Sequence, residues 1–190
     1  LIDKKREIER FKKLMSTLYI DAINIGANMV TEELGSSSVV SFSLEFPEVI
    51  KYLQLRVSLV PSRIIEKISL ALEKIVKDNE IKELKVESVK MLFNKITKRV
   101  STIARTESSS LLVAGRVIQM FRNGVRYHKW VAARRDNPRE SHMYLNNQIV
   151  KIGNSFSPDF TLRFPGDLMA PIEETMGCTC FTVMAVKIDD

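Results

Sequence analysis

The chain has 190 residues, of which 45% are hydrophobic and 27% are charged, and its formal net charge is +6. This length is enough for one large domain or two small ones. The composition is that of an ordinary globular protein. No apolar run approaches the roughly 20 residues that cross a bilayer, and the charged start lacks a secretory signal, so no membrane-spanning segment is expected. Two cysteines are too few for a disulfide framework, which favours a reducing compartment.

The first element in chain order is a helix. From Ile2 to Leu34 the apolar residues recur at helical intervals, and Gly35 is a suitable stop because glycine adopts left-handed backbone at little cost. Apolar and polar residues alternate too irregularly in residues 36–46 for the sequence to favour a strand over a loop. A loop whose apolar side chains pack onto a helix accounts for them equally well.

Residues 47–60 are compatible with either a helix or an extended segment. The clearest helical pattern in the chain follows at 61–79, PSRIIEKISLALEKIVKDN, which has one continuous apolar face. Pro61 is expected near the start of this helix, where a missing N–H costs nothing, and Ser62 is a candidate cap.

A short break precedes a long helix from about Val86 to Arg122, and Asn123 with Gly124 supplies a left-handed end. After Gly124 the helical period disappears. Strand-like alternation or β-branched runs then occur in VRYHKWVAAR, QIVKI and FTVMAVKI, separated by glycine and proline.

The sequence therefore predicts an α+β fold. A helical region covers residues 1–85, and residues 86–190 contain a long helix followed by a small, loop-rich part with a short antiparallel sheet. The change in character falls near Asn123, and no internal repeat is present.

The positive charge permits several partners. Lysine and arginine concentrate near the start, around Lys90–Arg99, and in RNGVRYHKWVAARR. A basic surface attracts nucleic acid or acidic protein without sequence specificity, although solvated helix faces carry the same charge. Contact with DNA is thus permitted by the charge and not required by it.

Two stretches, RRDNPRESHMYLNNQ and MGCTCF, hold both cysteines and one of the two histidines. His142, Cys178 and Cys180 offer the imidazole and thiolate ligands that zinc prefers, and Asp136 offers a carboxylate as a fourth. These four residues form a candidate Zn²⁺ site.

The spacing of the cysteines leaves an alternative open. Cys-x-Cys is a weaker zinc signal than Cys-x-x-Cys, although a turn after Gly177 makes shared ligation feasible. Alternatively, both cysteines are small buried apolar residues beside the last strand. His128 lies in a basic strand and is expected at the surface.

Catalytic motifs are not evident. A zinc deaminase would need His-x-Glu and Pro-Cys-x-x-Cys, whereas His142 is followed by Met143. A cysteine–histidine nucleophile pair would have neither an orienting residue nor an oxyanion hole in this sequence. Phosphate-binding glycine loops, HExxH and GxSxG do not occur. Arg105 and Glu107 in RTESSS are expected to form ion pairs within or between helices, so no enzyme is predicted.

Several elements follow one another in a recognisable order. They are Arg105-Thr106-Glu107 on a helix, Gly124, Lys129-Trp130 on a strand, then Asp136, Arg139 and His142, then Phe156, Pro165-Gly166-Asp167 and Cys178-x-Cys180. From about Val86 to the C-terminus, the chain resembles the phage Mu F-type minor head protein family, also called the phage head morphogenesis domain. The N-terminal helical part carries no motif of its own.

The chain departs from the family pattern at three places. Asp136 and Arg139 are one residue closer together than in the pattern, and Asn147 stands where the family commonly has glycine. Thr179 stands where an arginine is common between the cysteines, which removes a donor that could pair with Asp136 or with a partner carboxylate.

The resemblance implies a virion structural protein, present in few copies in the capsid interior or at the portal vertex and assembled in the host cytoplasm. Its expected partners are the portal protein, other head proteins and packaged DNA, the last through non-specific contact with the basic surface. The motif residues are expected to form a small cross-linked core, held by Zn²⁺ or by a polar network, with Trp130 beside it. An alternative is an effector or toxin-type enzyme domain carried by a phage head protein.

Overall fold

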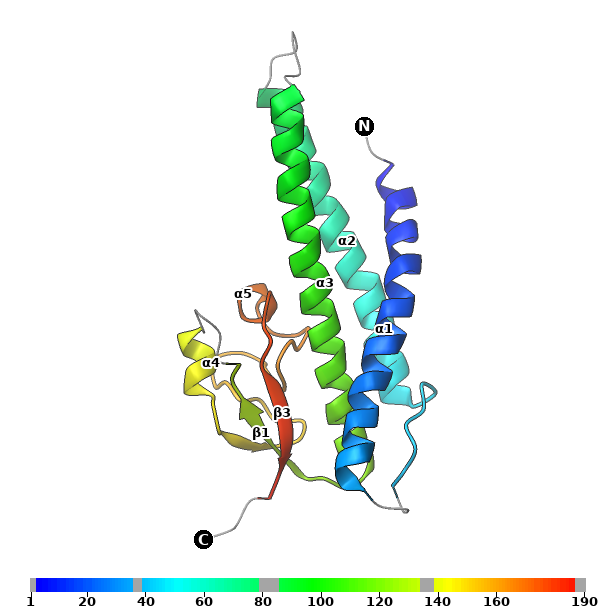
Figure 1. Ribbon diagram of the computed structural model, residues 1–190, viewed down its shortest axis with the longest axis vertical. Coiled ribbons are helices and arrows are strands. Elements are labelled where there is room, and N and C mark those ends of the chain that lie inside the picture. Colours follow the sequence, from blue (N-terminus) through cyan, green and yellow to red (C-terminus); the bar gives the residue numbers. More distant parts are fainter. Residues whose placement is uncertain (1–2, 36–38, 79–85, 134–138, 187–190) are drawn as a thin grey trace.

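The computed structural model describes residues 3–35, 39–78, 86–133 and 139–186 (Figure 1). Three long helices dominate it: α1 (Lys4–Leu34), α2 (Pro47–Asp78) and α3 (Val86–Arg122). A small unit, called the C-terminal unit, lies against the side of α3 (Figure 1). Its elements are β1 (Tyr127–Val131), α4 (Glu140–Tyr144), β2 (Ile149–Lys151), α5 (Ile172–Thr175) and β3 (Phe181–Ala185). The predicted α+β class is confirmed. The predicted boundary at 85 falls at the edge of 79–85, outside the described residues.

Helix α1 ends where the sequence predicts. The Asp3 carboxylate accepts a hydrogen bond from the Arg6 backbone N–H at 3.1 Å, which caps the first turn. At the other end Gly35 has a φ of 58°, and its N–H donates to the Thr31 carbonyl. None of the helices that the structure describes is both long enough and apolar enough to cross a membrane.

Helix α2 is continuous through the proline at its centre, so the predicted helix start at Pro61 is wrong. Ser62 is not a cap, because its hydroxyl donates to the Ser58 carbonyl one turn earlier, at 3.0 Å. An internal proline costs about 3 kcal/mol through the lost hydrogen bond and ring contacts. Val60 and Ile64, on either side of it, are both buried, and this burial offsets the cost.

The loop after α1 packs onto the helices, which confirms the loop interpretation of residues 39–46. The Phe42 and Phe46 rings lie edge to face, with centroids 5.9 Å apart, against the apolar core. The side chain of Gln119 on α3 donates to the Val40 carbonyl at 2.7 Å and fixes the start of the loop.

Helices α1 and α3 touch through their backbones. A Cβ atom added at Gly26 of α1 would lie 1.9 Å from the carbonyl oxygen of Leu112, and one added at Gly115 of α3 would lie 2.1 Å from that of Ile23. The two glycines therefore set the separation of the helices. The core around this crossing contains Met15, Tyr19, Ala22, Ile23, Val49 and Leu111.

Helix α3 ends in the predicted left-handed turn. Gly124 has a φ of 76°, and its N–H donates to the Phe121 carbonyl at 3.1 Å. The next N–H, that of Val125, donates to the Met120 carbonyl at 3.0 Å, which completes a Schellman motif. The chain then turns directly into β1.

The three predicted strands form one antiparallel sheet in the order β2-β1-β3. Along β1 the exposed fractions alternate, and the buried face carries His128 and Trp130, which are both fully buried. The prediction that His128 lies at the surface is wrong. The charged neighbour within the strand, Lys129, is on the opposite face, while the face of His128 packs against the Phe156 ring, 4.9 Å away between centroids.

Two polar contacts attach the C-terminal unit to α3. The buried guanidinium of Arg116 donates from Nε to the Thr182 carbonyl of β3 at 3.1 Å. Its two Nη atoms donate to the Glu33 carboxylate of α1 at 2.7 and 3.0 Å. Nearer the N-terminal end of α3, the Thr106 hydroxyl accepts a hydrogen bond from the Gly177 N–H at 2.7 Å.

Candidate metal centre

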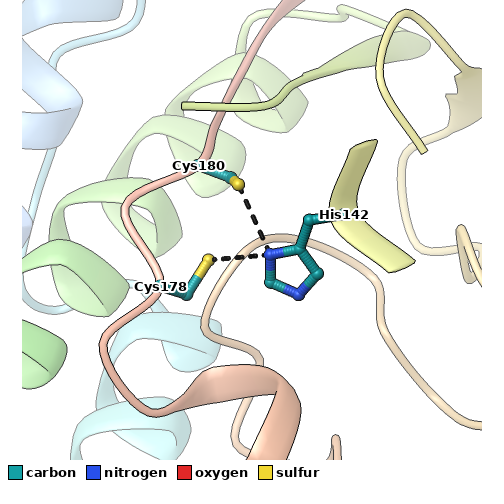
Figure 2. Close-up of side chains that lie close together, drawn as sticks. All are labelled: His142, Cys178 and Cys180. Atoms are coloured by element: carbon teal, nitrogen blue, oxygen red, sulfur yellow. Dashed lines mark hydrogen bonds between the residues drawn. The ribbon is translucent and has the colours of Figure 1, made fainter. Parts of the chain in front are cut away.

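His142, Cys178 and Cys180 meet inside the C-terminal unit (Figure 2). The His142 Nδ1 atom lies 3.5 Å from the Cys178 sulfur and 3.4 Å from the Cys180 sulfur. The three side chains are only 3%, 5% and 6% exposed. Their ligand atoms all lie within 4.8 Å of one another, so the three side chains can hold a metal ion. We call this group of three residues the metal cluster.

Two short segments position the metal cluster. His142 projects inward from the single turn of α4. Gly177 has a φ of 71°, a conformation that favours glycine, and turns the chain after α5. Cys178 and Cys180 then lie two positions apart on the segment entering β3, and both are buried while the residue between them is not. The turn at Gly177 is present as expected, and both sulfurs lie close to the His142 ring.

The distances fit a tetrahedral ion. Zinc bonds of about 2.0 Å to nitrogen and 2.3 Å to sulfur, at tetrahedral angles, separate the two ligand atoms by about 3.5 Å. Both nitrogen–sulfur distances in the cluster have this value. Three protein ligands leave one coordination position, and Asp136, the predicted fourth ligand, lies outside the described residues.

Glu174 stands behind the imidazole. Its Oε2 atom lies 3.0 Å from the His142 Nε2 atom, although the ring N–H points too far from that oxygen to form a well-aligned hydrogen bond. The Ser141 hydroxyl donates to the same oxygen at 3.0 Å and fixes it. The carboxylate lies beside Nε2, so the opposite ring nitrogen, Nδ1, is the one that faces the two sulfurs.

The two thiols do not lose their protons independently. Contact with Cys180 raises the pKa of the Cys178 thiol, and burial raises it further. Contact with Cys178 lowers the pKa of Cys180, and His142 also lowers it. One sulfur is therefore stabilised as a thiolate while its neighbour keeps a proton. A bound divalent cation would replace that proton, because cysteine binds metals as the thiolate.

An apolar shell surrounds the metal cluster. The Trp130 ring lies edge-on to the His142 ring, with centroids 5.3 Å apart, and to the Phe156 ring at 5.2 Å. Ala132, Leu145 and Leu162 complete the buried shell. Excluding water in this way lowers the local dielectric constant and strengthens the attraction between a cation and thiolates.

The other predicted motif residues lie around the metal cluster and not in it. Arg139 donates a hydrogen bond to the Met176 carbonyl, directly before the Gly177 turn. Glu107 is buried in α3 and forms an ion pair with Arg56 of α2, which confirms the expected pairing between helices for this residue. Arg105 is exposed, and the described part of the chain contains no ion pair that includes it.

Arg56 is a central residue that the sequence analysis missed. Its Nε and Nη2 atoms donate to the Glu107 carboxylate at 2.7 and 3.0 Å. Its Nη1 atom donates to the Tyr52 hydroxyl at 2.5 Å and to the Gly166 carbonyl at 3.4 Å. The sequence did contain a signal, because Arg56 interrupts an apolar stripe between Tyr52 and Val60, where a charge needs a buried partner.

Tyr19 connects α1 to the same ion pair. Its hydroxyl donates to the Glu107 carboxylate at 2.8 Å. Burial, and then the charge of Glu107, raise the pKa of Tyr19 above its usual range, so the hydroxyl remains a donor at every ordinary pH. This buried network therefore joins all three long helices to the turn at Gly166.

Asp167 organises that turn. Its buried carboxylate accepts hydrogen bonds from the backbone N–H groups of Arg163 and Met169 and from the Arg163 guanidinium, at 2.7 to 3.1 Å. The preceding Gly166 has a φ of 79°, and a Cβ atom there would lie 2.1 Å from the Ser110 hydroxyl of α3. The turn can therefore rest directly on α3.

His128 makes the fold sensitive to acid. Neither ring nitrogen has a hydrogen-bond partner among the described residues, and burial lowers the pKa of His128 to about 4. As pH falls below about 6.5, the unfolded chain binds this proton before the folded chain does, so stability is lost between about pH 6.5 and 4. The loss from this residue is roughly 3 kcal/mol.

We expect His128→Leu to remove that part of the acid sensitivity. The measurement is denaturant-induced unfolding of both proteins near pH 7 and near pH 4. The wild type should lose roughly 3 kcal/mol more than the variant over this interval. An equal loss in both proteins would show that His128 does not carry the effect.

Compared with protein-family models, with curated protein sequences and with solved structures, the chain shows no match.

Proposed function

We propose that this chain is a minor head protein of the phage Mu F type. In this proposal it associates with the portal vertex and acts in head morphogenesis and in DNA packaging or delivery, as a structural protein and not as an enzyme. The support comes from the ordered elements of the sequence, which run from Arg105 to Cys180.

One observation carries the proposal. Elements of the resemblance that are far apart in sequence meet where the C-terminal unit joins α3, and each makes a supporting contact. Thr106 binds the Gly177 N–H, Glu107 binds the arginine that reaches Gly166, and Asp167 holds the adjoining turn. Contacts of this kind stabilise the junction between the C-terminal unit and the helices, as a structural role requires.

We further propose that the metal cluster binds Zn²⁺ as a structural ion. In its described residues, the C-terminal unit has a sheet of three short strands and a small apolar core, and a metal commonly stabilises units of this size. The donor set of one imidazole and two thiolates suits zinc, and the Glu174 carboxylate lies on the far side of the imidazole, beside Nε2.

The zinc proposal predicts about one zinc ion per chain in the purified protein. Cys178→Ser/Cys180→Ser should lose the ion and lower the melting temperature, because a structural metal stabilises only the folded state. Elemental analysis and thermal unfolding, each with and without a chelator, measure both effects. Thr179→Ala, between the two ligands, is the matched control and should retain the metal. Well-folded wild type without metal would leave the cysteines as core residues.

The head-protein proposal is tested with the portal protein encoded by the same phage genome. The full chain should co-sediment with assembled portal rings. Its binding to duplex DNA should weaken as salt rises and should be equal for unrelated sequences. A chain that sediments apart from the rings at all stoichiometries would contradict the proposal, whatever its metal content.

A further inference from the structure

A groove runs along the line where α2, α3 and α5 meet. It consists of two adjoining hollows of about 100 and 80 Å³, which share the side chains of Ile64, Ile103 and Ile172. None of the three residues of the metal cluster lines it. The groove is therefore separate from the metal cluster.

The groove exposes apolar surface. Val100 of α3 is 42% exposed, Ile172 of α5 is 40% exposed and Met176, just after α5, is 37% exposed. Exposed large apolar side chains that gather in one patch usually mark a contact site.

The rim of the groove is positively charged. Arg63 and Lys67 on α2 and Arg99 on α3 are all exposed. The remaining charged residues of the lining, Arg56 and Glu107, neutralise each other. The described part of the lining thus has three cations and no uncompensated carboxylate. This charge distribution favours a partner with acidic residues on either side of an apolar stripe.

The size of the hollows indicates what enters them. Sites for drug-sized ligands enclose about 300–1,000 Å³, whereas each hollow here has room for one apolar side chain. On α2 the first hollow is lined by Arg56, Val60, Arg63 and Ile64, and the second by Arg63, Ile64, Lys67 and Ile68. The second hollow therefore lies about one turn, roughly 5 Å, further along the helix. A helix that presents apolar residues at positions i and i+4 has the same spacing.

We propose that this groove binds an acidic amphipathic helix of a partner protein. Two apolar side chains, one turn apart, fill the two hollows, and flanking carboxylates pair with Arg63, Lys67 and Arg99. This is the helix-in-groove mode of recognition, and it requires neither the metal ion nor the head-protein role.

The probe is a capped helical peptide with two leucines four positions apart and four flanking glutamates in an alanine–glutamine background. Matched peptides carry lysine for glutamate, or alanine for leucine. Binding to the full chain is followed by peptide anisotropy and by the isoleucine methyl signals of the protein. Only the first peptide should bind, and it should shift the signals of Ile64, Ile103 and Ile172.

A charge exchange makes the test specific. Arg63→Glu/Arg99→Glu should bind the acidic peptide about tenfold or more weakly and should gain affinity for the lysine peptide. Both arginines are exposed, so the fold should be unchanged by circular dichroism. Equal binding of acidic and basic peptides, or shifts away from the groove, would overturn the proposal. So would shifts of these three signals by duplex DNA or anionic lipid vesicles but not by the peptide.

Discussion

Replacing Glu107 with alanine is expected to lower the free energy of unfolding by about 3–5 kcal/mol, the usual cost of leaving a buried charge without its partner. The Arg56 guanidinium, only 2% exposed, would lose two of its hydrogen bonds, and Tyr19 would lose its acceptor. For a chain of this length, the melting temperature should fall by roughly 6–20 °C.

Urea and thermal unfolding measure this effect, and the chain offers a matched control. Glu7 pairs with Arg10 at 3.2 Å on the exposed face of α1, so Glu7→Ala should cost less than about 1 kcal/mol. The double variant Arg56→Met/Glu107→Leu removes both charges and should recover most of the lost stability. A loss below about 1 kcal/mol for Glu107→Ala would mean that water reaches Arg56 in the folded protein.

Gly115→Ala is expected to cost about 3 kcal/mol, although alanine is the better helix former by about 1 kcal/mol. The added Cβ atom would meet the Ile23 carbonyl oxygen at 2.1 Å, and a backbone atom cannot turn aside as a side chain can. Helices α1 and α3 would have to separate and would lose packing along their whole contact. Gly26→Ala, on the facing helix, should act in the same way because its Cβ atom would meet Leu112.

Asn28→Ala is the control for helix propensity, because Asn28 is exposed on α1 close to the crossing. It should change the free energy of unfolding by less than about 0.5 kcal/mol. Denaturant unfolding of all three variants makes the comparison. If both glycine variants were as stable as wild type, the helices would have to be further apart than the structure places them.

Regular elements could be predicted from the sequence because their apolar period is local. Gly35 and Gly124 ended helices as expected, since each provides a left-handed residue that its helix end needs. The alternation in β1 also placed His128 on the same face as Trp130. The prediction of an exposed His128 is wrong because this alternation, and not the charge of neighbouring residues, decides which side chains of the strand are buried.

Contacts between distant segments could not be predicted in the same way. Pro61 looks like a helix start because the destabilisation by a proline inside a helix is a local effect that the sequence alone reveals. The burial that offsets this destabilisation comes from neighbouring elements, which the sequence does not reveal. His142, Cys178 and Cys180 were grouped by their chemistry alone. Glu174 is one of several glutamates, and only the fold brings it behind the imidazole.

The order of the helices has a consequence for synthesis. Tyr19 of α1 reaches its acceptor Glu107 only across 88 residues of chain, and the glycine crossing likewise joins α1 to α3. A ribosome adding roughly 5–20 residues per second needs roughly 4–18 s to make that length. During this interval the apolar face of the nascent α1 lacks its contact with α3, so that face stays uncovered until residue 107 and the rest of α3 have been made.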